Sequence, residues 1–131
     1  MLYRDVFELK TETNKFYDIT DKIANIIKQS RIADGICNIF LPATTAGLLI
    51  NENDRMLIED YRRLLEDLAP DGRLYQHPEN AQSHLKAAIF SQNVTVPITN
   101  GKMALGTWQN IILWEFDETS RDRKIIVTII Y

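Results

Sequence analysis

The sequence predicts one α+β domain that is built mainly on antiparallel strands. Two short apolar segments, residues 94–98 and 102–105, flank Asn100-Gly101, a pair that favours the type I′ turn of a β-hairpin. Two more segments with the composition of strands, residues 108–116 and 124–131, follow. In the middle of the chain, residues 55–68 carry the apolar periodicity of an amphipathic helix.

The first quarter of the chain predicts strands followed by a helix. Leu2–Thr11 mixes apolar and charged residues, as a strand with one solvent-facing side does, and residues 16–19 are a shorter candidate. Thr20-Asp21 offers side-chain oxygens to the free N–H groups of a helix start. We expect this helix to end within residues 30–35.

The central part predicts two strands and the clearest helix. Residues 36–41 are rich in branched and aromatic side chains and end at Pro42, which favours a strand, and residues 47–50 favour another. The helix over residues 55–68 is stopped by Pro70 and Gly72. Its apolar stripe consists of Leu57, Ile58, Tyr61, Leu64, Leu65 and Leu68.

Two later segments have weaker patterns. Residues 80–89 predict a shorter helix with Leu85, Ala88 and Ile89 on its inward face. The last strand, residues 124–131, is apolar on both faces, which indicates either the interior of a sandwich or a subunit interface.

Composition bounds the size and the partners of this domain. The chain has 131 residues, 45% of them hydrophobic, so we expect a single domain over residues 1–131. With 15 basic and 18 acidic residues it lacks the basic face that nucleic acids require, and Arg62-Arg63 and residues 121–124 are interpreted as solvated surface. No apolar run reaches the ~20 residues that cross a bilayer. A lone cysteine, Cys37, and a charged N-terminus indicate a soluble cytoplasmic protein.

The only two histidines, His77 and His84, lie in one segment that leads from a loop into a helix. Their imidazoles could converge on one site as general acid and base, or as neutral metal ligands. The alternative gives each a surface or hydrogen-bonding role without chemistry, and their spacing matches no zinc motif.

Two polar segments at strand ends are further candidates. Thr44 and Thr45 follow a predicted strand, where hydroxyls and free N–H groups either hold a phosphate or simply form a turn. Asn51 and Glu52 precede the long helix, where magnesium would find hard oxygen ligands. The next two residues, Asn53-Asp54, are explained as the helix cap.

Trp108 and Gln109 follow a glycine at the start of a predicted strand. A flat ring beside hydrogen-bonding groups suits a planar heterocycle, although core tryptophans are common and Trp114 is interpreted as one. Cys37 lies within a strand and is interpreted as inert, because a reactive thiol needs an electropositive, partly exposed setting.

Four segments together resemble the YjbQ family of secondary thiamine-phosphate synthase enzymes. They are Leu41-Pro42-Ala43-Thr44-Thr45-Ala46-Gly47, Ile50-Asn51-Glu52-Asn53, the segment from His77 to Lys86, and Gly106-Thr107-Trp108-Gln109. Their order and spacing agree over about residues 17–127. The resemblance implies an antiparallel β-sandwich with flanking helices, assembled as a homotrimer with pockets near subunit boundaries.

The resemblance also implies a weak transferase activity that joins a thiazole phosphate to a pyrimidine pyrophosphate, giving thiamine phosphate and pyrophosphate. Lys86 and the threonines would hold a phosphate, His77 or His84 would move a proton, and magnesium near Glu52 would stabilise the leaving group. A zinc ion on His77 and His84 is a further option. The family's polar pocket maps onto Thr44, Thr45, Asn51, Glu52, His77, Asn80, His84, Lys86, Trp108 and Gln109.

One departure from the family pattern concerns catalysis. Ala43 stands where the family usually has a histidine before the two threonines. If that histidine is a base or a metal ligand, this chain has lost it. Two other hypotheses therefore stand beside the transferase: a non-catalytic binder of a small phosphorylated metabolite, and a purely structural trimer.

Overall fold

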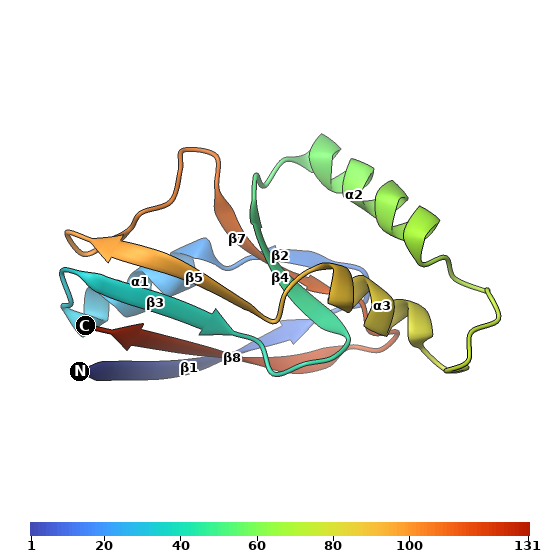
Figure 1. Ribbon diagram of the computed structural model, residues 1–131, viewed down its shortest axis with the longest axis horizontal. Coiled ribbons are helices and arrows are strands. Elements are labelled where there is room, and N and C mark those ends of the chain that lie inside the picture. The colour runs from blue at the N-terminus through green and yellow to red at the C-terminus, as the bar shows by residue number, and fades with distance from the viewer.

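The computed structural model describes all 131 residues and contains two antiparallel sheets and three helices (Figure 1). The larger sheet has five strands in the order β1-β8-β3-β5-β6, and the smaller has three in the order β2-β7-β4. The predicted α+β class with antiparallel sheets and flanking helices is confirmed. The strands are β1 (Leu2–Thr11), β2 (Phe16–Asp18), β3 (Gly35–Phe40), β4 (Ala46–Asn51), β5 (Asn93–Thr99), β6 (Lys102–Met103), β7 (Asn110–Glu115) and β8 (Arg121–Ile130); the helices are α1 (Thr20–Ser30), α2 (Arg55–Leu68) and α3 (Ala81–Ile89).

The main core combines both sheets with α1. The alternation of side chains along β8 buries Ile125, Val127 and Ile129 on one face, as expected for a strand with period two. Helix α1 adds Ile23 and Ile27, which are spaced one turn apart and belong to the same cluster. Each such side chain contributes roughly 2 kcal/mol when fully buried.

A second, smaller cluster attaches α2 and α3 to the three-stranded sheet. It consists of Ile58 and Leu65 from α2, Ala87 from α3, and the aromatic pair Trp114 and Phe116. The two rings stack with their centroids 5.7 Å apart, and Trp114 is 1% exposed, which confirms its interpretation as a core residue. This packing holds α3 beside the start of β4 (Figure 1).

The strongest local signals are confirmed. Asn100 and Gly101 have φ of 52° and 75°, the two positive values that a type I′ turn needs. Helix α2 has the predicted bounds, and Asp54 caps it by accepting a hydrogen bond from the backbone N–H of Leu57 at 2.9 Å. No helix of the structure has the length and apolar character required to cross a membrane.

The start of α1 differs from the prediction. The N-cap residue is Ile19, whose side chain cannot cap the helix, and the carboxylate of Asp18 accepts instead from the backbone N–H of Thr20 at 3.0 Å. Thr20 already lies inside the helix, and its hydroxyl donates to Asp18 at 2.6 Å and accepts from the backbone N–H of Ile111 at 2.9 Å. The hydroxyl therefore joins α1 to β7 instead of serving the free N–H groups.

One prediction of a buried face is wrong, and one is narrowed to a single alternative. The outer face of β8 is only partly covered, with Ile130 56% exposed, so this face does not lie in a sandwich interior and the subunit interface stays a prediction. In α3 the predicted inward residues Leu85 and Ile89 are 45% and 46% exposed, whereas Lys86 is 8% exposed. Helix α3 instead buries Ala81, Ser83, Lys86 and Ala87 and lies against β4.

Candidate functional site

The loop after β3, the start of α3 and the β7–β8 connection meet around a pocket of about 410 Å³. We call it the threonine–arginine pocket. Four residues that the sequence predicted for one site, Thr44, Thr45, Asn80 and His84, all line it. The remaining lining residues are Pro42, Ala43, Asp117, Arg121 and Arg123.

The two threonines have different surroundings. Thr45 is 5% exposed, and its hydroxyl donates to Asp117 Oδ2 at 2.9 Å while it accepts from Arg123 Nη2 at 2.8 Å. Both hydrogen-bonding functions are thus already used within the chain. Thr44 is exposed, and its hydroxyl has no partner in the chain. Thr44 can therefore contact a ligand, whereas Thr45 holds the wall of the pocket.

A buried carboxylate holds the arginine on this wall. Glu115, at the end of β7, is 0% exposed and accepts from Arg123 Nε at 2.7 Å and from Arg123 Nη2 at 2.6 Å. The hydroxyl of Thr11 donates to it at 2.6 Å and the backbone N–H of Asp117 at 3.1 Å. A buried ion pair of this kind is tolerated only when further hydrogen bonds complete it, as they do here.

Asp117 plays the same part for the second arginine. Arg121 donates to Asp117 Oδ2 from Nε at 3.1 Å and from Nη2 at 2.9 Å. Burial by itself would raise the pKa of Asp117, but hydrogen bonds from the Thr119 backbone, from Thr45 and from Arg121 lower it to about 2. Asp117 is therefore ionised at neutral pH. Neither arginine has a partner in the chain for its Nη1 group.

The prediction of solvated surface at residues 121–124 is wrong for Arg123, whose side chain is 12% exposed. The side chain of Arg121 is half exposed, in agreement with the prediction, and is bonded to Asp117. The alternation of β8 carried the signal, since Arg123 has the same parity as the buried Ile125 and Val127. No local pattern indicated the carboxylate partner of Arg123, because Glu115 ends the apolar strand β7.

The two imidazoles lie together. The ring centroids of His77 and His84 are 5.1 Å apart with an interplanar angle of 66°, and both line a neighbouring pocket of about 320 Å³. His84 also lines the threonine–arginine pocket, so the two pockets meet at this residue. We call the neighbouring pocket the histidine pocket. Tyr75, Gln76, Ala81 and Leu85 complete its lining.

The donor set around the imidazoles does not fit the predicted metal. Catalytic zinc takes three protein ligands, and no group of three or more His, Cys, Asp or Glu residues occurs in the structure. His77 and His84 supply two nitrogens only.

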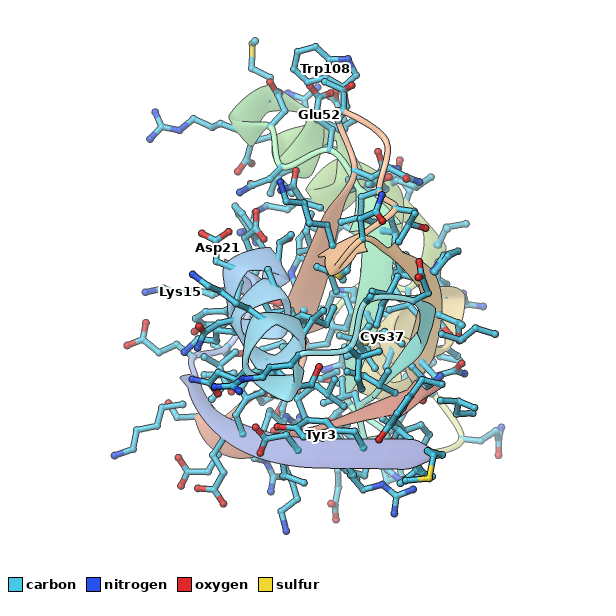
Figure 2. The ribbon with its side chains drawn as sticks, turned by 90° about the vertical axis from the view of Figure 1, so that its left-hand side faces the viewer. Tyr3, Lys15, Asp21, Cys37, Glu52 and Trp108 are labelled. Carbon is cyan, nitrogen blue, oxygen red and sulfur yellow. The ribbon has the colours of Figure 1, made fainter.

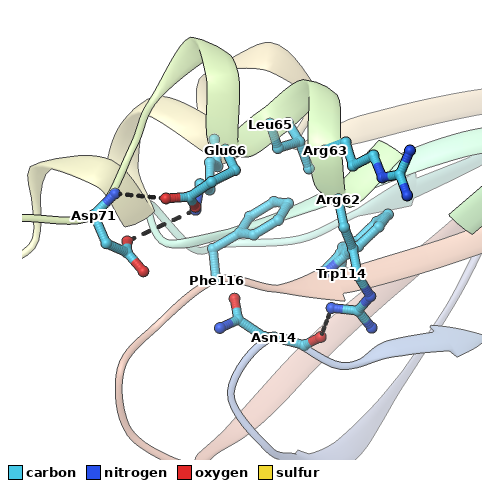
Figure 3. Close-up of a pocket in the computed structure, with 9 residues that line it drawn as sticks. Asn14, Arg62, Arg63, Leu65, Glu66, Asp71, Trp114 and Phe116 are labelled. Atoms are coloured by element: carbon cyan, nitrogen blue, oxygen red, sulfur yellow. Dashed lines mark hydrogen bonds and ion pairs between the residues drawn. The ribbon is translucent and has the colours of Figure 1, made fainter. Parts of the chain in front are cut away.

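Lys86 occupies a different pocket, which we call the lysine pocket (Figure 3). Its ammonium lies 3.3 Å from Glu66 and 3.8 Å from Asp71, and the figure shows these two carboxylates side by side, with Trp114 and Phe116 below α2. Side chains two residues apart on a helix point about 200° apart. Lys86 therefore faces away from His84, and the expected meeting of this lysine with Thr44 and Thr45 does not occur.

Hydrogen bonds fix the rim of the lysine pocket. The backbone N–H of Asp71 and, with a smaller effect, the Lys86 ammonium lower the pKa of Glu66 against the effect of burial. The Arg62 guanidinium lies 5.3 Å from the centroid of the Trp114 ring and donates to the backbone carbonyl of Asn14 at 2.6 Å.

The remaining predicted residues line a fourth pocket of about 360 Å³, the indole pocket. It lies at the far end of β4, where Trp108 and Glu52 come together (Figure 2). The six residues of β4 span about 17 Å, and the threonine–arginine pocket lies at the opposite end. Within one chain, the predicted residues of the indole pocket and those of the threonine–arginine pocket therefore do not form one site. The lining consists of Ile50, Asn51, Glu52, Trp108 and Gln109.

The thiol of Cys37 takes no part in these pockets. It is buried in β3, and burial raises its pKa to about 11. A thiol in this state is a poor nucleophile, which agrees with its interpretation as an inert core residue.

Comparison with known proteins identifies the family. The family model described as UPF0047 protein YjbQ-like matches residues 5–131. The chain belongs to the YjbQ family. The predicted resemblance is thereby confirmed, and the match extends beyond the four motifs that carried it.

Relatives of this YjbQ-family chain occur in archaea and bacteria. It is 43% identical over 126 residues to a UPF0047 protein of Archaeoglobus fulgidus, covering 92% of this chain and 97% of the relative. It is 30% identical to YjbQ of Escherichia coli O157:H7, covering 98% of each chain.

Solved structures share the fold. A YjbQ-family protein of Clostridium acetobutylicum superposes with a TM-score of 0.89 at 39% identity, covering 96% of this chain and 99% of that one. A protein of Sulfolobus solfataricus, described as being of unknown function, superposes with a TM-score of 0.88 at 32% identity and covers 98% of both chains.

Proposed function

We propose that this chain binds a small phosphorylated metabolite in the threonine–arginine pocket. The observation that carries the proposal is the distribution of donors there. Asp117 and Glu115 each hold one arginine, and each arginine keeps an unpaired Nη1. The hydroxyl of Thr44 is also free. Guanidinium and hydroxyl donors in fixed positions are the groups that recognise phosphate oxygens.

Net charge does not supply the attraction. The positive charges of Arg121 and Arg123 are cancelled by the ionised Asp117 and by Glu115. An anion is therefore held by directed hydrogen bonds, which favours a specific phosphate over a diffuse ion atmosphere. Asn80 and His84 add polar groups to the lining of the pocket.

Calorimetric titration with pyrophosphate tests the proposal. We expect saturable binding by the unaltered chain and a roughly tenfold or larger loss of affinity in Arg121→Ala, because one charge-assisted donor group is removed. Lys86→Met is the matched control, since it removes a positive charge from a different pocket. Absence of pyrophosphate binding, or equal affinities of the unaltered chain and Arg121→Ala, would overturn the proposal.

Transferase chemistry of the thiamine-phosphate synthase type is the second candidate. The contact between His77 and His84 at the edge of the threonine–arginine pocket favours it, because an imidazole there can donate a proton to departing pyrophosphate. The positions of Lys86 and Trp108 in other pockets give it no support within one chain.

Ala43 offers a direct test of this second candidate. It lines the threonine–arginine pocket at the position where the family usually has a histidine. We expect Ala43→His to raise the rate of thiamine phosphate formation from the two precursors above that of the unaltered chain. If neither protein forms product although both bind pyrophosphate, the transferase is excluded and the binding function stands.

Self-association as a homotrimer, which the family resemblance implies, is also proposed. The outer face of the five-stranded sheet exposes Leu2, Val6, Ile36, Phe40 and Ile130 by 40–56% each. The polar row Arg4, Thr128 and Asn38 divides these side chains into two groups on the same face. Exposed apolar groups rimmed by polar residues mark interaction sites. Sedimentation equilibrium should give three times the mass of the chain, and a monomer mass at micromolar concentration would exclude the trimer.

We also propose a cytoplasmic location, where a lone thiol stays reduced.

A further inference from the structure

The indole pocket has a composition unlike that of the threonine–arginine pocket. Trp108, on the loop before β7, is 71% exposed although it is among the largest apolar side chains of the molecule. Glu52, which follows β4, lies in the same pocket, and both residues lie at one end of the molecule (Figure 2). No lysine or arginine lines this pocket.

Both amide oxygens of the indole pocket already accept a hydrogen bond within the chain. Asn51 donates from Nδ2 to the hydroxyl of Tyr61 at 2.6 Å and accepts from the backbone N–H of Glu52 at 2.8 Å. Gln109 Oε1 accepts from the backbone N–H of Gly106 at 2.8 Å and so fixes the loop that carries Trp108. These two amides hold the framework of the pocket.

What remains available to a ligand is the Glu52 carboxylate, the indole face of Trp108 and the amide nitrogen of Gln109, which has no partner in the chain. The carboxylate of Glu52 is partly buried and makes no hydrogen bond or ion pair within the chain. A partly desolvated anion without a partner favours binding of a positive charge. The negative face of an indole attracts the same charge, and tryptophan is the aromatic residue with the strongest such attraction.

We propose that the indole pocket is a second ligand site that binds a small organic cation, an alkylammonium group, between the Trp108 ring and the Glu52 carboxylate. A magnesium ion fits less well, because it requires several hard oxygen ligands. Glu52 supplies the only carboxylate that lines the pocket, and the amide oxygens of Asn51 and Gln109 each already accept a hydrogen bond. An alkylammonium needs one carboxylate and one aromatic face, and the pocket offers both. This site does not depend on the threonine–arginine pocket.

Titration with choline and with its neutral isostere 3,3-dimethyl-1-butanol tests the proposal. Tryptophan fluorescence reports on the site, because Trp108 is 71% exposed while Trp114, the second of the two tryptophans, is 1% exposed. We expect choline to bind about fivefold more tightly than the neutral isostere, as a cation–π contact near the surface predicts. Added salt should weaken choline binding only, because exposed charges are screened.

Variants separate the two recognition groups. Glu52→Gln should weaken choline binding about fivefold and leave the neutral isostere unaffected, whereas Trp108→Leu, followed by calorimetry, should weaken binding of both. Glu79→Gln, which removes an exposed carboxylate outside the pocket, is the control and should change neither affinity. Pyrophosphate affinity should be unchanged in all three variants, so this inference and the phosphate site can fail separately.

Three results would each overturn the proposal. The first is equal affinity for choline and its neutral isostere in the unaltered chain, and the second is a choline affinity that Glu52→Gln leaves unchanged. The third is a change of sedimenting mass in Trp108→Leu, since the ring would then be covered by a second copy of the chain and not by a small cation.

Discussion

The substitution Glu115→Gln isolates the buried support of the threonine–arginine pocket. Glu115 is 0% exposed and receives two hydrogen bonds from Arg123, one from Thr11 and one from the backbone of Asp117. Glutamine has the same shape but no charge, and its NH₂ group faces donors where an oxygen accepted. Arg123 is then a buried cation without a counter-ion, because its side chain is only 12% exposed.

The magnitude follows from that burial. Breaking one partner of a buried ion pair costs about 3–5 kcal/mol, and we expect about 3 kcal/mol because Arg123 keeps its bond to Thr45. For a chain of this size, with an m-value of about 1.5–2 kcal/mol/M, the urea midpoint should fall by about 1.5–2 M. Pyrophosphate affinity should fall as well, since Arg123 loses its fixed position.

Urea unfolding followed by circular dichroism measures the effect, with the exposed Glu79→Gln as the control, expected within about 0.5 kcal/mol of the unaltered chain. The double variant Glu115→Leu, Arg123→Met removes both charges and should recover most of the lost stability. The reasoning is refuted if Glu115→Gln unfolds at the same urea concentration as the control, or if the double variant is no more stable than the single one.

Three further predictions concern stability. Asp54→Ala should lower the free energy of unfolding by about 1 kcal/mol through loss of the α2 cap, measured by urea unfolding. Gly47→Ala should cost about 1–3 kcal/mol, because a Cβ there would lie 2.8 Å from the Cβ of Phe90; a neutral result in thermal unfolding would contradict this packing. The pKa of Asp117 is about 2 when folded and 3.8 as its ordinary value, so its ionised form stabilises the fold above about pH 4, and roughly 2 kcal/mol is lost as the pH falls from about 4 to 2. Urea unfolding measured between pH 4 and pH 2 should show a smaller decrease of the free energy of unfolding in Asp117→Asn than in the unaltered chain.

Local sequence patterns were sufficient for most of the fold. The alternation of β1 and the turn at Asn100-Gly101 arise from contacts among neighbouring residues, and so does the apolar stripe of α2. The pattern of α3 misled, because its apolar residues lie on the exposed side and its small residues pack on β4. In a nine-residue helix few side chains report the direction of the core.

The candidate site was predicted in part. Thr44, Thr45, Asn80 and His84 were named from the sequence and share one pocket in the structure. Trp108 was named for the same site but lies at the far end of β4. The family motifs therefore indicated which polar residues are candidates for a site. They did not indicate that these residues are divided among separate pockets.

The sequence by itself determined where strands and helices form, because those preferences depend on side chains a few positions apart. Only the tertiary structure decided which carboxylate meets which arginine. Glu115 reaches Thr11 across 104 residues and Arg123 reaches Thr45 across 78, and each of these pairs is set by strand pairing and loop closure. The burial of these side chains and the pairing of their charges depend on the whole sheet, so no local sequence pattern predicts them.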